Sequence, residues 1–184
     1  MRKVVLITGL QAAGKSTVAP LLASRLGPPA ATLDGDVFYR GVVAGAVGMT
    51  PDPSPEAIRQ LELRYAATAK IAQHYADAGF DFTCSDIILG PDVARWFDAL
   101  HDVEPHLVVL VPSIDSVVER ELGRGSTAYR DWQAADGTLA DAVRALERDL
   151  LATPRRGLWL DTTHQTPTET VEAILENDLK SSLW

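Results

Sequence analysis

The chain has 184 residues, of which 46% are hydrophobic, and it contains one cysteine. This composition predicts a single globular domain spanning residues 1–184 and excludes a disordered, fibrous or internally disulfide-bonded protein. A formal net charge of −8 argues against a nucleic-acid or membrane-surface partner, because such partners need a basic surface. No apolar stretch reaches the roughly 20 residues of a membrane span. The single cysteine and the lack of a leader-like pattern at the N-terminus predict a cytoplasmic location, and the oligomeric state is left open.

Short apolar runs alternate with longer amphipathic segments along the chain. Strands that alternate with helices are typical of a parallel sheet with helices on both faces. The sequence therefore predicts an α/β fold of three layers around a five-stranded parallel sheet. The expected strands are Val4–Thr8, Ala31–Leu33, Phe80–Cys84, Leu107–Val111 and Leu158–Leu160.

The expected helices are placed by the signals at their ends. A helix from Lys15 stops before Gly27, and the longest one begins at Ser54-Pro55 and closes at Gly79. Further helices are expected after Pro91 and over Ser113–Leu122, Leu139–Leu151 and Pro167–Leu179. The polar segment 123–138, which contains glycine and arginine, is predicted to form a lid-like loop within the domain.

The first strand leads directly into the stretch GLQAAGKST, from Gly9 to Thr17. This stretch fits the G-x(4)-G-K-[ST] pattern, after a strand and at the start of a helix. Backbone N–H groups of such a loop converge on phosphate, and the helix N-terminus adds its positive end. Lys15 is expected to reach the β- and γ-phosphates and to act in catalysis. Ser16 is expected to bind Mg²⁺.

The stretch thus predicts ATP and Mg²⁺ as cofactors, although the choice between ATP and GTP stays open. The alternative is an ordinary glycine turn with a solvated lysine. The residues expected to bind the nucleotide are Gly9, Ala12, Ala13, Gly14, Lys15, Ser16 and Thr17.

Carboxylates follow the second and third expected strands, where ligands of open α/β sheets bind. Asp36 is predicted to be the base for an attacking hydroxyl, and Asp34 and Arg40 to bind the acceptor. Either aspartate can instead cap the next helix, and Arg40 can pair with a surface carboxylate. Asp86 is expected near Mg²⁺ or the substrate, with a turn cap as its alternative.

Positive charge for the migrating phosphate is expected around the lid-like loop. Arg124 and Arg130 are predicted to be catalytic there, whereas Arg120 lies between two glutamates and fits a solvated helix end equally well. The stretch Gly41–Pro55 is predicted to line part of an acceptor pocket for a moderately apolar substrate. Asp161–Thr163 can support a purine or form a plain turn.

Three segments, GLQAAGKST, LDGD and LVVLVPSIDSVVEREL, resemble the small P-loop kinases of the nucleoside monophosphate kinase-like group. The resemblance implies a P-loop NTPase fold and ATP-dependent transfer of the γ-phosphate to a hydroxyl of a small molecule, such as an antibiotic or another metabolite. The segment DVFYR is similar to chloramphenicol phosphotransferase-like and zeta-toxin-like kinases, in which an aspartate at the place of Asp36 is the base.

Two alternatives remain from the sequence. The first is a kinase that acts on adenylylsulfate or on a sugar nucleotide, because TGLQAAGKST and LDGD also look like adenylylsulfate kinase and toxin-like kinases act on sugar nucleotides. The other alternative is a nucleotide-dependent regulatory switch with slow hydrolysis of the nucleotide.

Overall fold

A five-stranded sheet forms the centre of the molecule in a computed structural model, which describes residues 1–50, 52–124 and 147–184. The strand order is β2-β3-β1-β4-β5, and each pair of neighbours is parallel. The predicted five-stranded parallel sheet is therefore confirmed. Its strands are β1 (Arg2–Gly9), β2 (Ala30–Asp34), β3 (Asp81–Ser85), β4 (Val103–Leu110) and β5 (Leu158–Leu160).

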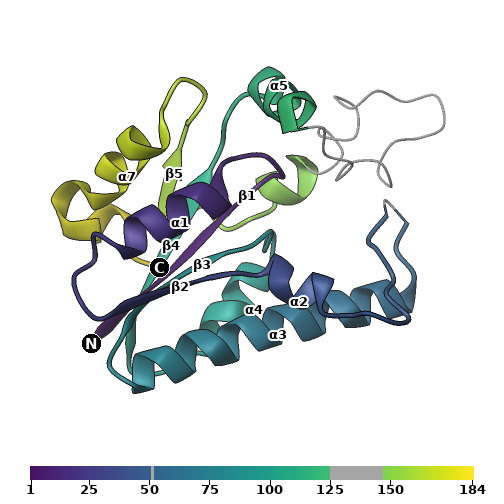
Figure 1. Cartoon of the computed structure of the whole chain (residues 1–184), viewed down its shortest axis with the longest axis horizontal. Coiled ribbons are helices and arrows are strands. Elements are labelled where there is room, and N and C mark those ends of the chain that lie inside the picture. The colour runs from purple at the N-terminus through teal and green to yellow at the C-terminus, as the bar shows by residue number, and fades with distance from the viewer. Residues whose placement is uncertain (51, 125–146) are drawn as a thin grey trace.

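Helices cover both faces of this sheet, as Figure 1 shows. α1 (Lys15–Ala23) and α7 (Pro167–Leu175) lie on one face, and α3 (Pro55–Asp77) and α4 (Asp92–Asp98) lie on the other. Successive residues of β1 alternate between the two layers, because side chains along a strand point to opposite faces. Val4 and Leu6 belong to the cluster under α3 and α4, and Val5 and Ile7 to the cluster under α1 and α7. The three-layer arrangement is thus confirmed.

The ends of several elements follow the expected signals. Ser54 caps α3 by accepting a hydrogen bond from the Ala57 N–H at 3.2 Å, with Pro55 in the first turn. β4 starts at Val103 rather than Leu107, because its first half pairs with the start of β1. The described chain also contains the helices α2 (Asp36–Arg40) and α5 (Ile114–Arg124).

The C-terminal helix was expected to reach Leu179, and this expectation is wrong. α7 ends at Leu175 and the 3₁₀ segment η2 (Glu176–Ser182) follows it. Three residues of η2 have positive φ angles, which interrupt a regular α-helix: Asn177 at 54°, Asp178 at 55° and Leu179 at 62°.

Part of the sequence-based prediction falls outside the described residues. Arg130 and nearly all of the segment 123–138 lie there, as does the side chain of Arg124, the last residue of α5. Of the helix expected over 139–151, residues 147–151 are described and are helical. In the described ranges, none of the helices combines the length and apolar character needed to cross a membrane.

Candidate functional site

The loop between β1 and α1 has the backbone shape that its glycines allow. A Cβ atom on Gly9 would lie 2.4 Å from the carbonyl oxygen of Leu110, so only glycine fits beside β4. Gly14 precedes α1 with a φ angle of +101°, a conformation that side chains disfavour. No side chain caps the start of α1. The first N–H groups of this helix can therefore donate hydrogen bonds to a bound anion.

Lys15 turns back into this loop. Its side chain is buried, and Nζ donates a hydrogen bond to the carbonyl oxygen of Leu10 at 2.7 Å. Ser16, the next residue of α1, is exposed. An ammonium group inside the loop can bind the phosphates of a nucleoside triphosphate, and a hydroxyl at the helix start can bind its Mg²⁺. These residues therefore fit that cofactor.

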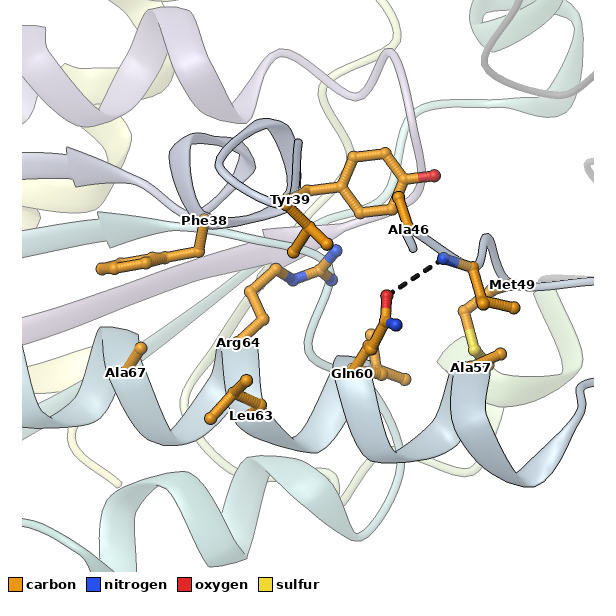
Figure 2. Close-up of a pocket in the computed structure, with 12 residues that line it drawn as sticks. Phe38, Tyr39, Ala46, Met49, Ala57, Gln60, Leu63, Arg64 and Ala67 are labelled. Atoms are coloured by element: carbon orange, nitrogen blue, oxygen red, sulfur yellow. Dashed lines mark hydrogen bonds between the residues drawn. The ribbon is translucent and has the colours of Figure 1, made fainter. Parts of the chain in front are cut away.

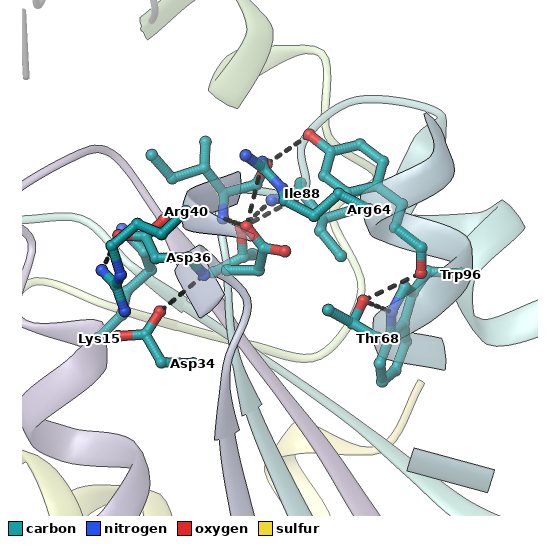
Figure 3. A network of polar contacts seen from close by, with 12 residues as sticks. Lys15, Asp34, Asp36, Arg40, Arg64, Thr68, Ile88 and Trp96 are labelled. Atoms are coloured by element: carbon teal, nitrogen blue, oxygen red, sulfur yellow. Dashed lines mark hydrogen bonds and ion pairs between the residues drawn. The ribbon is translucent and has the colours of Figure 1, made fainter. Parts of the chain in front are cut away.

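Strand pairing brings the expected carboxylates to this loop. β3 lies between β1 and β2, and its end is tied to both neighbours. The Gly35 N–H donates to the Ser85 carbonyl at 2.9 Å, and the Asp86 N–H donates to the Ile7 carbonyl at 3.2 Å. One pocket is lined by Gln11, Ala12, Gly14, Lys15 and Ser16 together with Asp34, Asp36, Ser85, Asp86 and Ile87. Figure 3 shows Lys15, Asp34 and Asp36 gathered at this edge of the sheet.

Asp34 and Asp36 differ in their surroundings. Asp34 accepts a hydrogen bond from the backbone N–H of Asp36 at 3.0 Å, so it holds the start of α2, as one of the sequence alternatives expects. The Asp36 side chain is 50% exposed, and its Oδ2 lies 4.0 Å from Nη1 of Arg40. Asp36 therefore keeps an accessible carboxylate at the pocket.

Asp86 is the deeply buried carboxylate of this pocket, with a side chain only 1% exposed. Its Oδ1 accepts a hydrogen bond from the Ile87 N–H at 2.7 Å and lies 3.2 Å from Nη2 of Arg64. Its Oδ2 has no hydrogen-bond partner within the described residues. Burial raises the pKa of Asp86, and the Arg64 charge acts against that rise. The orphaned oxygen fits a ligand group that the pocket would receive.

Gly35 sets the room available to Asp86. A Cβ atom on Gly35 would lie 2.1 Å from Oδ2 of Asp86 and 2.4 Å from its Cγ. The φ angle of Gly35 is −59°, an ordinary helical value. This glycine is therefore required by close packing and not by its backbone conformation.

Arg64 is a site residue that the sequence reasoning missed. It lies on α3 and is spaced at helical intervals from the buried residues Ala57, Thr68 and Ala72. An arginine on the inward stripe of a helix is a signal for a buried ionic partner, because an unpaired charge is costly there. That spacing could have identified Arg64, although it could not have identified Asp86 as its partner.

A second pocket lies between α2, α3 and the segment after α2, with a cavity volume of about 100 Å³. Figure 2 shows Arg64 and Gln60 extending from α3 toward Tyr39 and the segment that carries Ala46. Four residues of the segment 41–55 line this pocket, and the prediction that the segment lines an acceptor pocket stays a prediction. The lining consists of Phe38, Tyr39, Val42, Ala46, Val47, Met49, Ala57, Gln60, Leu61, Leu63, Arg64 and Ala67.

The remaining expected residues have structural contacts of their own. Arg120 donates from Nη2 to the carbonyl oxygen of Thr162 at 2.9 Å, which joins α5 to the loop after β5. Asp161 accepts from the Thr163 N–H at 2.9 Å and forms the plain turn that the sequence allowed. Cys84 is buried in β3, and burial raises the pKa of its thiol. The described residues hold no cluster of three or more His, Cys, Asp or Glu suited to a metal ion.

Known protein structures share this architecture. The APS kinase of Mycobacterium tuberculosis in complex with AMPPNP and APS is 22% identical, with 95% of this chain and 96% of that chain covered and a TM-score of 0.64. A sugar kinase from Janibacter sp. is 17% identical, with coverages of 95% and 92% and a TM-score of 0.59. A gluconokinase from Sinorhizobium meliloti 1021 is 16% identical, with coverages of 94% and 90% and a TM-score of 0.59.

Identities at this level establish the fold that these proteins share, an α/β P-loop NTPase fold. No curated protein matches the chain. A family model described as an AAA domain matches residues 4–170, which include the phosphate loop, α2 and Asp86. On this match over most of its length, the chain belongs to the AAA domain family.

Proposed function

We propose that the protein is an ATP-dependent kinase that transfers the γ-phosphate to a hydroxyl group of a small molecule. The observation that carries the proposal is a single pocket lined by Lys15 and Ser16 on one side and by Asp36 and Asp86 on the other. A regulatory switch requires only the phosphate loop. A kinase also requires a group that accepts the proton of the attacking hydroxyl, and an accessible carboxylate facing the loop can do this. The sugar kinase, the gluconokinase and the APS kinase that share the fold support the same general activity.

Each side of the pocket has a proposed role. ATP with Mg²⁺ supplies the transferable phosphoryl group and the cation that offsets its charge. The N–H groups of residues 9–14, Lys15 and Thr17 would hold the phosphates, and Ser16 would bind the metal. Asp86 would approach the metal or its water through Oδ2. Mg²⁺ would thus be held jointly by the protein and the phosphates.

In the transfer step, Asp36 is proposed to act as the base. Asp36 would accept the proton as the acceptor oxygen forms its bond to phosphorus and the bond to the leaving ADP oxygen breaks. Lys15 and the loop N–H groups would stabilise the charge that spreads over the phosphoryl oxygens. Arg124 and Arg130 are proposed for the same task on the basis of the sequence. The products are a phosphomonoester and ADP.

The experiment that tests the proposal measures ATP consumption by the pure protein with Mg²⁺, alone and with a panel of hydroxyl compounds. The panel contains antibiotics, nucleosides, sugars and adenylylsulfate, and the products are identified by mass. An acceptor-dependent phosphorylated product is expected. Slow hydrolysis of ATP that no acceptor accelerates would contradict the kinase and would favour the regulatory switch.

A further inference from the structure

We infer that the acceptor is an uncharged alcohol with a largely apolar body, which occupies the pocket between α2 and α3. The inference rests on the proposed function and adds the chemical class of the acceptor to it. It follows from the charges that line this pocket, from the polar groups that are already engaged there, and from the place of Asp36 beside it.

The pocket adjoins the proposed base. Asp36 and Tyr39 are three residues apart on α2, so they lie on the same face of that helix. Tyr39 lines the apolar pocket, and Asp36 lines the nucleotide pocket. An acceptor whose body lies against Tyr39 can therefore present a hydroxyl to Asp36.

Most side chains that face this pocket are aliphatic or aromatic. Val42, Ala46, Val47 and Met49 come from the segment after α2, and α3 contributes further apolar residues. Such a surface gains free energy by removing an apolar body from water, and these aliphatic side chains form no hydrogen bonds with the hydroxyl groups of a sugar. The lining therefore favours an aromatic or alicyclic body over a polyhydroxylated one.

The amide of Gln60 is already engaged. Its Nε2 donates to the Gly45 carbonyl at 2.9 Å and to Glu56 Oε1 at 2.7 Å, and its Oε1 accepts from the Val47 N–H at 3.0 Å. Gln60 thus holds the segment after α2 against α3, as the dashed line in Figure 2 shows for the Val47 bond. An acceptor that required this amide would have to release the segment.

The charge of Arg64 is also engaged. Arg64 is the cation of the described pocket lining, and it pairs with buried Asp86 at 3.2 Å. An anionic acceptor that captured Arg64 would leave Asp86 as an uncompensated buried charge, which is strongly unfavourable. Arg40, expected from the sequence to bind the acceptor, does not line this pocket. The pocket therefore disfavours adenylylsulfate and sugar nucleotides.

One hydrogen-bond donor in the lining has no partner. The Nε atom of Arg64 is buried and lacks a hydrogen-bond acceptor within the described residues. A neutral oxygen on the ligand can accept this bond without disturbing the pair with Asp86. A ligand oxygen that reached this Nε would leave the pair with Asp86 intact, so the alcohols to compare first carry one neutral ether, carbonyl or amide oxygen.

The test compares acceptors of different charge with ATP and Mg²⁺ at fixed concentration. Neutral aromatic and alicyclic alcohols that carry one amide or ether group are compared with adenylylsulfate, a sugar nucleotide and free hexoses. The kcat/KM for ADP formation is expected to be at least about 100-fold higher for the best neutral alcohol than for adenylylsulfate, the sugar nucleotide or a free hexose. A higher kcat/KM for an anionic acceptor would overturn the inference and leave the kinase activity standing.

Variants then locate the acceptor. Ala46→Trp, which fills the pocket, is expected to raise the KM for the alcohol by about tenfold or more, with the Kd for ATP unchanged. The matched control is Val43→Trp, because Val43 lies in the same segment but is 94% exposed and outside the lining. Ala67→Met, on α3, repeats the test should Ala46→Trp fail to fold. Equal KM values in all variants would overturn the inference.

A direct binding measurement separates this inference from the proposed function. Should none of the acceptors support turnover while ATP binds, the kinase proposal fails. Calorimetric binding of the neutral alcohols to the wild-type protein and to the Ala46 variant then decides the ligand class. Binding that the variant loses supports the apolar pocket as a site for such alcohols, and an absence of binding refutes it.

Discussion

Arg64 and Asp86 form an ion pair at the boundary between the two pockets, with Nη2 and Oδ1 3.2 Å apart. Arg64 lines the apolar pocket and Asp86 lines the nucleotide pocket. Their side chains are 13% and 1% exposed. One contact therefore joins the wall of the proposed acceptor site to the floor of the phosphate site.

Removing the arginine from this pair is expected to destabilise the protein. Arg64→Met keeps the apolar stem but leaves Asp86 buried without its cation, so the free energy of unfolding should fall by about 3–5 kcal/mol. Denaturant unfolding measures the change. Arg59→Met on the same helix is the control, because Arg59 and Glu56 are 65% and 44% exposed, and it should have little effect. Equal changes in the two variants would contradict the buried pair.

The close approach of Gly35 to Asp86 yields a second prediction. Gly35→Ala places a Cβ 2.1 Å from Oδ2 of Asp86, so either α2 or the carboxylate must move. We expect a stability loss of about 1–3 kcal/mol together with a lower kcat. Thermal unfolding and turnover measure the two effects.

Gly123→Ala is the matched control for that variant. Gly123 lies near the end of α5, and nothing is within 4 Å of a Cβ placed there. Alanine should be neutral or stabilising by about 0.5–1 kcal/mol at this position, because it favours the helix. A similar loss in both variants would show that the contact with Asp86 is not the cause.

Asp36→Asn tests the proposed base. The asparagine keeps the shape of the side chain but cannot take a proton, so kcat should fall by about 10²- to 10⁴-fold while the Kd for ATP stays the same. Asp34→Asn should cause a smaller loss, because an amide oxygen can still accept the hydrogen bond from the Asp36 N–H. Steady-state kinetics on both variants compare the two roles. Full activity of Asp36→Asn would exclude Asp36 as the base.

The environment of His106 leads to a prediction about the pH dependence of stability. In its buried ring, Nδ1 lies 3.0 Å from Oγ of Ser182 and Nε2 lies 3.0 Å from Oε1 of Glu104. Burial lowers the pKa of His106, although Glu104 acts in the opposite direction. The unfolded chain therefore takes up a proton first as the pH falls below about 6.5. Stability contributed by the neutral ring should be complete above that pH and decrease as the pH falls toward the lower folded pKa.

Unfolding measured between pH 5 and pH 8 checks this dependence. His106→Gln should remove the decrease below about pH 6.5, whereas His101→Gln should keep it, because the His101 side chain is 68% exposed. A wild-type stability that rises as the pH falls through this range would give the opposite sign and refute the prediction.

The elements that the sequence predicted well are those whose signals are local. The phosphate loop follows from a spacing of glycines, a lysine and a serine within a few residues, and α3 follows from Ser54 and Pro55 at its start. The five strands follow from short apolar runs, and the pattern is clearest for β1, β3 and β4, whose residues are mostly buried. The end of α7 was misplaced because Asn177 and Asp178, residue types that tolerate positive φ angles, also occur within helices and are therefore a weak stop signal.

The sequence by itself thus determined the fold class, the phosphate loop and the presence of carboxylates at the edge of the sheet. Only the tertiary structure decided that Asp34 holds α2, that Asp86 is buried against Gly35, and that Arg64 neutralises it. The physical reason is range. A turn or a cap is set by neighbouring residues, whereas an ion pair between α3 and the end of β3 depends on how a helix packs on a sheet. Burial then strengthens the attraction between the two charges.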